Sequence, residues 1–293
     1  MTGAADTPPP LSQVDALVEG SLKDIGIPPR PAILEHISRE MLRDEPDYKR
    51  LAKVISADVG LAASLIKTAN SPFFGYRNRV RSINEALMML GLDVASRAIA
   101  GIILRKAFPS SPHLERFWDA SARIARVSGW LARYAGNHKL RPDDAYTFGL
   151  FRDCGIPVLM RRFPDYSKLL ARANSEEKLG FTAVEEAHLP TNHAMVGCLL
   201  AQSWWLPEEL CLAVRHHHDL ATLETPSPTP PLTSRYRIAI AQFAEHLVQR
   251  HTGLSHTREW LKLGAACLKL LDIAEDEIDG ILAEAVPVVD AEE

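Results

Sequence analysis

The sequence is poor in cysteine and has no metal-binding cysteine spacing. Only four cysteines occur among its 293 residues, and none forms a Cys-x-x-Cys pair or a zinc-finger pattern. Each lies among apolar residues, which is typical of small buried side chains in a reducing compartment. The sequence also lacks any run of about 18 apolar residues, the length of a membrane span, and residues 1–10 lack the pattern of a signal peptide. These absences predict a cytoplasmic protein that does not associate with membranes.

Charge of one sign is also scarce. The formal net charge is only -4, so the chain has no broad basic field of the kind that attracts a nucleic-acid backbone. It has no glycine-rich phosphate loop, no Gly-x-Ser-x-Gly nucleophile motif and no receiver-type phosphorylation pattern. We therefore do not expect nucleic acid as a partner. Because these catalytic and phosphorylation motifs are missing, the sequence offers no sign of the enzyme classes that use them.

Apolar residues at helical spacing run along most of the chain, and 46% of its residues are hydrophobic. Because no sustained alternation of apolar and polar residues occurs, we predict an all-α fold. The clearest break is Pro109-Ser110-Ser111-Pro112, where we place a subdomain boundary. The predicted organisation is a flexible tail (residues 1–11), an N-terminal helical subdomain (12–109), a second helical subdomain (110–286) and an acidic tail (287–293).

Capping residues and breakers predict where the helices begin and end. Asp47, Asp58 and Ser82 are predicted N-caps, and Gly91 is a predicted helix end. The capping-box pattern Thr182-Ala183-Val184-Glu185 predicts another helix start. Predicted helices cover residues 12–24, 48–56, 59–70, 82–91, 92–107, 191–203 and 207–217, with a long helix ending at 135 and one after Pro142 that holds residues 149–160.

Histidines and acids in the second half form the main candidate site. Arg152-Asp153, His193, His216-His217-His218 and Glu245 lie on successive predicted helices. Helical bundles build metal centres from such side chains on different helices. The spacing alone favours the other interpretation, in which these are solvated or boundary histidines.

Several ordered motifs resemble those of HDOD domains, which are noncatalytic relatives of the HD metal-dependent phosphohydrolases. The resemblance covers residues 27–252 and implies a helical N-terminal subdomain packed on an HD-like helical core. Its motifs are Ile27-Pro28-Pro29-Arg30-Pro31, Asn70-Ser71-Pro72-Phe73, Ala86-Leu87-Met88-Met89-Leu90-Gly91, Phe117-Trp118, Gly149-Leu150-Phe151-Arg152-Asp153-Cys154-Gly155, His193-Ala194-Met195-Val196-Gly197, Trp204-Trp205-Leu206-Pro207 and His217-His218.

The resemblance also implies where the hydrolytic site has changed. In catalytic HD enzymes a histidine after the aromatic pair, a His-Asp doublet and a later aspartate bind metal. Here Ala120 stands at the first position, Arg152 replaces the doublet histidine, and Glu245 stands for the later aspartate. Alanine has no lone pair and arginine presents only donors, so neither can bind a cation. Only Asp153 is unchanged, and Arg152 is expected to pair with it.

His193, His217 and His218 resemble additional histidines of some HD phosphodiesterases. With Asp153 and Glu245 they could hold a metal. The favoured interpretation is a hydrogen-bonded polar core inherited from the scaffold, with no resident metal or cofactor.

The segment 73–81 interleaves aromatic residues with arginines, a composition that suits contact with a partner. Tyr76, Arg77 and Arg79 are the predicted partner-binding side chains. The alternative is a structural loop whose phenylalanines anchor it while its arginines face solvent.

The sequence thus predicts a noncatalytic bacterial signal-transduction module that acts by protein–protein interaction. As the resemblance implies, its setting would be two-component or cyclic-diguanylate regulation, with other signalling proteins as partners. The alternatives are a divergent HD-type phosphohydrolase and a sensor that binds a nucleotide or other small molecule in the former active-site cleft.

Overall fold

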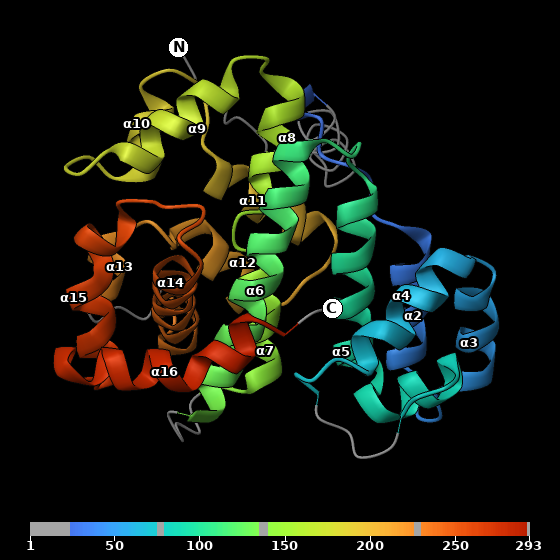
Figure 1. The fold of residues 1–293 in the computed structure, drawn as a ribbon. Helices are drawn as coiled ribbons and strands as arrows, with labels where there is room; N and C mark the ends of the chain where they lie inside the picture. The colour runs from blue at the N-terminus through green and yellow to red at the C-terminus, as the bar shows by residue number, and fades with distance from the viewer. Residues whose placement is uncertain (1–23, 75–78, 135–139, 226–229, 292–293) are drawn as a thin grey trace, which may run out of the picture.

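The computed structural model describes residues 24–74, 79–134, 140–225 and 230–291, and within them the chain is helical, without strands (Figure 1). This confirms the predicted all-α class. The helices are α2 (Ala32–Met41), α3 (Tyr48–Ser56), α4 (Val59–Ala69), α5 (Ile83–Lys106), α6 (Pro112–Tyr134), α7 (Pro142–Phe151), α8 (Gly155–Arg162), α9 (Tyr166–Ser175), α10 (Phe181–Glu186), α11 (His193–Ser203), α12 (Glu208–His216), α13 (Leu220–Glu224), α14 (Leu232–Thr252), α15 (Glu259–Leu271) and α16 (Ile278–Val289), with a 3-10 turn η1 (Glu275–Glu277).

Local capping sets several of these helix starts, as the sequence predicts. The Asp47 and Asp58 carboxylates each accept a backbone N–H 2.9 Å away in the first turn of α3 and α4. The Ser82 hydroxyl does the same for α5 at 3.2 Å. Gly91 has φ 74° and interrupts the helical backbone within α5, where the sequence predicts a helix end.

Helices α6 and α7 run through the middle of the molecule, and α14 packs beside them, between α6 and α15 (Figure 1). Helices α2 to α5 lie to one side, and α5 contacts α7, so both halves share one hydrophobic core. α14 is buried along most of its length. Among the described helices only α5 is long and apolar enough to cross a bilayer, but half of its most apolar window is buried in the molecule.

Two predictions about the second half are wrong. The predicted helix through residues 149–160 is two helices, because the chain turns at residues 152–154 between α7 and α8. The predicted capping box does not form, since α10 begins at Phe181 with Gly180 as an uncapped N-cap. Glu185 is instead fully buried. Pro157 favours the helix break, because it cannot donate a main-chain hydrogen bond to residue 153, and the contacts of Glu185 with His193 and Tyr166 account for the second difference. The predicted helix 12–24 lies outside the described residues except for its last one.

Candidate functional site

The turn between α7 and α8 holds Arg152 and Asp153 against α14. The Arg152 Nε atom lies 3.0 Å from Asp153 Oδ2, and its Nη2 atom lies 2.7 Å from Glu245 Oε1. The Arg152 side chain is only 5% exposed. Burial alone would lower the pKa of Arg152, but the charges of Asp153 and Glu245 together raise it. The guanidinium is therefore a permanent cation that joins two carboxylates.

Three imidazoles converge beside this ion pair. His193 begins α11, and His217 and His218 follow the end of α12. The Nε2 atom of His193 lies 3.2 Å from Nε2 of His217 and 3.1 Å from Nε2 of His218. The Oδ1 atom of Asp153 lies 3.1 Å from His217 Nε2 and 3.6 Å from His193 Nε2. These four side chains could hold a metal ion, because their ligand atoms all lie within 4.8 Å of one another.

The other ring nitrogen of each histidine has its own acceptor. Nδ1 of His193 lies 2.7 Å from Glu185, and Nδ1 of His218 lies 2.7 Å from Glu259. Nδ1 of His217 lies 2.7 Å from the main-chain oxygen of Val214. An unprotonated acceptor at this distance requires the proton to be on Nδ1. Each Nε2 therefore faces the centre of the cluster.

Charge in the cluster follows from burial and pairing. Burial would lower the pKa of His193, but Glu185 and Asp153 raise it to about 10. Burial and the neighbouring His218 lower the pKa of His217 to about 3. For Glu259, burial raises the pKa, yet His218 and Lys262 bring it down to about 2. At neutral pH His193 therefore carries a second proton and a positive charge, His217 is neutral, and Glu259 stays ionised.

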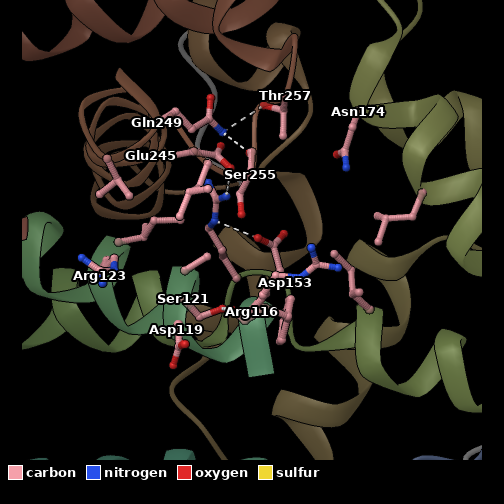
Figure 2. A pocket seen from close by; sticks show the side chains of 18 of the residues that line it. Arg116, Asp119, Ser121, Arg123, Asp153, Asn174, Glu245, Gln249, Ser255 and Thr257 are labelled. Atoms are coloured by element: carbon pink, nitrogen blue, oxygen red, sulfur yellow. Dashed lines mark hydrogen bonds and ion pairs between the residues drawn. The ribbon is translucent and has the colours of Figure 1, made fainter. Parts of the chain in front are cut away.

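A cavity of about 430 Å³ opens over this site. Asp153 and Glu245 line it together with Arg116 and Arg123 of α6 (Figure 2). Ala120 lines the cavity with only a methyl group. The cavity is of the size that small ligands use, since such pockets run from about 300 to 1,000 Å³.

The structure brings together the seven residues that the sequence places at the altered HD-type site, namely Ala120, Arg152, Asp153, His193, His217, His218 and Glu245. Five of them line the cavity: Ala120, Arg152, Asp153, His218 and Glu245. His193 and His217 are buried behind Asp153. His216, the first histidine of the triplet, is separate, since its Nδ1 atom lies 3.7 Å from Asp219 and its side chain is 32% exposed.

Two acids of the site are absent from the sequence-based set. The sequence pattern places Glu185 in a capping box, whereas its contacts in the structure are His193 and the Tyr166 hydroxyl. Glu259 is the first residue of α15 and is buried against His218. Neither has a sequence signal for this role, because each meets its histidine only through the tertiary fold.

Of the predicted partner-binding residues, Tyr76 and Arg77 lie outside the described residues, and Arg79 is exposed. The flanks of this segment are fixed. Phe73 is buried and stacks on Tyr146 with ring centroids 4.5 Å apart. Asn70 exchanges two hydrogen bonds of 2.8 Å with the main chain of Val80.

The chain belongs to the HDOD domain family, whose model matches residues 27–220. Its helical architecture is therefore that of a fold related to the HD phosphohydrolases.

Known proteins of similar sequence and fold come from several bacteria. An uncharacterized protein of Treponema pallidum (strain Nichols) is 27% identical over 214 residues, which are 73% of this chain and 41% of that protein. The chain thus spans about two fifths of that relative's length. An HDOD domain protein of unknown function from Geobacter sulfurreducens superposes with a TM-score of 0.65 at 24% identity, covering 96% of this chain and 98% of that one. A candidate phosphohydrolase from Shewanella amazonensis SB2B gives 0.66 at 19% identity, with 94% and 96% covered. At these identities the solved structures establish the shared fold.

Proposed function

We propose that this protein is a noncatalytic bacterial signalling module that acts by binding other proteins. The observation that carries the proposal is the position of Arg152, whose guanidinium contacts both Asp153 and Glu245. An HD-type hydrolase needs a metal ion between such groups to activate water. Here the Arg152 guanidinium lies between the two carboxylates instead and balances one of their two negative charges.

The presence of Ala120 and Arg152 at two ligand positions removes two nitrogen donors from the hydrolytic centre. Ala120 contributes only a methyl group to the cavity wall. Family membership supports a signalling role, because HDOD proteins are associated with two-component and cyclic-diguanylate regulation. We propose that the partners are signalling proteins in the cytoplasm, a setting supported by four free, buried cysteines.

A second candidate function is a small-molecule sensor. The cavity over Arg152 is favourable for it, because apolar residues such as Phe117 and Phe181 line it together with Arg116 and Arg123. That combination suits a nucleotide base and its phosphates. Equilibrium dialysis with nucleoside phosphates and cyclic dinucleotides distinguishes this function, since a pure protein-binding module takes up none.

The surface that carries partner binding is proposed to include the segment 73–81. Arg79 is exposed while Phe73 and Val80 on either side of it are buried, so its side chain is available without a role in the core. Tyrosine and arginine are enriched among residues that dominate binding energy. Because the sequence predicts that the core does not need Tyr76, Arg77 and Arg79, the triple variant Tyr76→Ala/Arg77→Ala/Arg79→Ala is expected to melt like the wild type, within about 0.5 kcal/mol.

Affinity capture from the native bacterium tests this proposal. Partners identified by mass spectrometry are purified and titrated against the wild type, the triple variant and the surface control Arg39→Ala. The triple variant is expected to lose at least tenfold in affinity, while Arg39→Ala binds like the wild type. Equal affinity of all three proteins would place the interface elsewhere.

A further inference from the structure

We propose that a second cavity, between the N-terminal helices and the central ones, binds a small organic phosphate no larger than a nucleoside monophosphate. This cavity measures about 290 Å³ and is lined by residues of α4, α5, α6 and α7. It shares no lining residue with the cavity over Arg152. The inference goes beyond the proposed noncatalytic function and does not depend on it.

The described residues that line this cavity carry charge of one sign. They include four cations, Lys67, Arg105, Lys106 and Arg126, and no carboxylate. The whole chain has 37 acidic side chains against 33 basic ones, so a lining without acids does not simply reflect composition. Positive side chains in a cavity with low-dielectric walls concentrate the potential and attract anions. The ligand is therefore expected to be negatively charged.

The cations differ in how far the protein itself balances them. Lys106 lies 3.4 Å from Asp58, and Arg105 lies 2.7 Å from Glu115, and neither acid lines the cavity. Lys67 is exposed and has no carboxylate within ion-pair distance in the described parts of the chain. An anion in the cavity would thus supply the negative charge that Lys67 lacks.

The hydrogen-bonding groups of the lining suit phosphate. Phosphate oxygens are acceptors, and the planar guanidinium of arginine donates to them in pairs. Arg126 lines the cavity with its side chain only 5% exposed, so it is held in place by packing. The hydroxyls of Thr68 and Ser71 lie in the same lining.

The Ser71 hydroxyl gives independent support for a ligand. Its oxygen is buried and forms no hydrogen bond with any group in the described residues. Buried polar groups in native proteins are nearly always hydrogen-bonded. An acceptor oxygen on a bound ligand would satisfy this hydroxyl.

The rest of the wall is apolar and explains why the phosphate should carry an organic group. Ile102, Trp118, Tyr146 and Leu150 contribute to it. Trp118 is only 5% exposed and packs edge-on against Phe117, with ring centroids 4.7 Å apart. A bare inorganic anion would leave this wall without contacts. The volume lies at the lower end of small-ligand pockets, which run from about 300 to 1,000 Å³, and therefore favours a ligand of mononucleotide size or smaller.

The position of the cavity gives the ligand a regulatory effect. Helices α4 and α5 precede the predicted boundary at residues 109–112, and α6 and α7 follow it. A ligand in the cavity contacts both sides of this boundary. Because a ligand that binds only the folded chain stabilises it, the concentration of the phosphorylated compound would determine how firmly the two halves are held together.

Calorimetric titration of the full chain is the test, with AMP, ribose 5-phosphate, inorganic phosphate and adenosine as probes. We expect one AMP per chain, weaker binding of ribose 5-phosphate and inorganic phosphate, and no measurable binding of adenosine, which lacks the phosphate. No saturable binding of the three phosphates at millimolar concentration would overturn the site. Inorganic phosphate or adenosine that binds as tightly as AMP would overturn it as well.

Three variants test whether the cavity holds the ligand. Lys67→Ala should weaken AMP binding by at least about tenfold, since a hydrogen bond to a charged group is lost. Arg126→Lys keeps the buried positive charge but loses the paired donors, and should weaken AMP binding several-fold. Lys53→Ala removes an exposed cation of α3 outside the cavity and should bind AMP like the wild type. If Lys67→Ala and a folded Arg126→Lys both bind AMP like the wild type, the assignment is wrong.

Arg116→Ala separates this cavity from the one over Arg152, where the second candidate function places a nucleotide. Arg116 lines only the cavity over Arg152. AMP binding that is retained in Arg116→Ala and weakened in Lys67→Ala supports the new site. AMP binding that is lost in Arg116→Ala and unchanged in Lys67→Ala assigns the ligand to the other cavity and overturns this inference, without bearing on the proposed noncatalytic function.

Discussion

The guanidinium of Arg152 lies 2.7 Å from the Glu245 carboxylate and 3.0 Å from that of its neighbour Asp153. This contact joins the turn between α7 and α8 to the central helix α14. The arginine is thus a structural element of the cleft. It stands at the position where the resemblance to HD enzymes implies a metal-binding histidine.

Removal of this cation should destabilise the fold. Arg152→Ala leaves the two largely buried carboxylates of Asp153 and Glu245 without the cation that they share, and breaking a buried ion pair costs about 3–5 kcal/mol. Urea denaturation at pH 7 measures the loss. Arg116→Ala is the matched control, because Arg116 lines the same cavity from an exposed position and should cost within about 0.5 kcal/mol. Coincident unfolding curves for Arg152→Ala and the wild type would refute the structural role.

Close backbone contact at Gly155 positions Asp153 beside His193. A Cβ atom at Gly155 would lie 2.0 Å from the His193 carbonyl oxygen and 2.7 Å from the Gly197 nitrogen. Gly155→Ala should therefore cost about 1–3 kcal/mol or more, since main-chain atoms must shift to admit the methyl group. Thermal unfolding measures this change.

Gly280→Ala is the control for that substitution. Gly280 lies in α16, and a methyl group added there would meet no atom within 4 Å beyond its chain neighbours and the nearby backbone of its own helix, so alanine should raise stability by about 0.4–1 kcal/mol. A loss of stability at Gly280 similar to that at Gly155 would show that the packing argument is wrong.

His246 should make stability depend on pH. It is partly buried and stacks on Trp260 with ring centroids 4.2 Å apart. Burial, with a smaller effect of Arg250, lowers the pKa of His246 from 6.5 to about 4. Between these values the unfolded chain binds the proton and the folded chain does not, so His246 lowers stability as the pH falls from 6.5 towards 4.

His246→Phe removes this proton uptake and keeps an aromatic ring against Trp260. The variant should lose less stability than the wild type when urea midpoints are compared at pH 7.0 and pH 4.5. Parallel losses in both proteins would show that His246 is protonated equally in the folded and unfolded states.

Local signals predict the helices that local contacts determine. Asp47 and Asp58 cap α3 and α4 through bonds to residues three positions away, so each start can be inferred from a short segment. The all-α class follows in the same way from apolar periodicity.

Features that depend on distant contacts are not predictable in this way. The helix break at residues 152–154 has a local signal in Pro157, which fits the first turn of a helix but not its interior, and the packing of Gly155 on α11 fixes its position. Glu185 matches a capping-box pattern but is drawn into the core by His193 and Tyr166. The histidines are visible in the sequence, whereas their converging geometry comes only from the packing of α10, α11, α12 and α15.

Turnover by the purified wild type tests the central claim most directly. Protein loaded with Zn²⁺, and separately with Mn²⁺, is incubated with cyclic dinucleotides and with nucleoside phosphates, and products are separated by chromatography. Because Arg152 and Ala120 cannot bind a hydrolytic metal, we predict no product above the level of an Asp153→Asn control. Metal-dependent turnover by the wild type that is lost in Asp153→Asn would contradict the account.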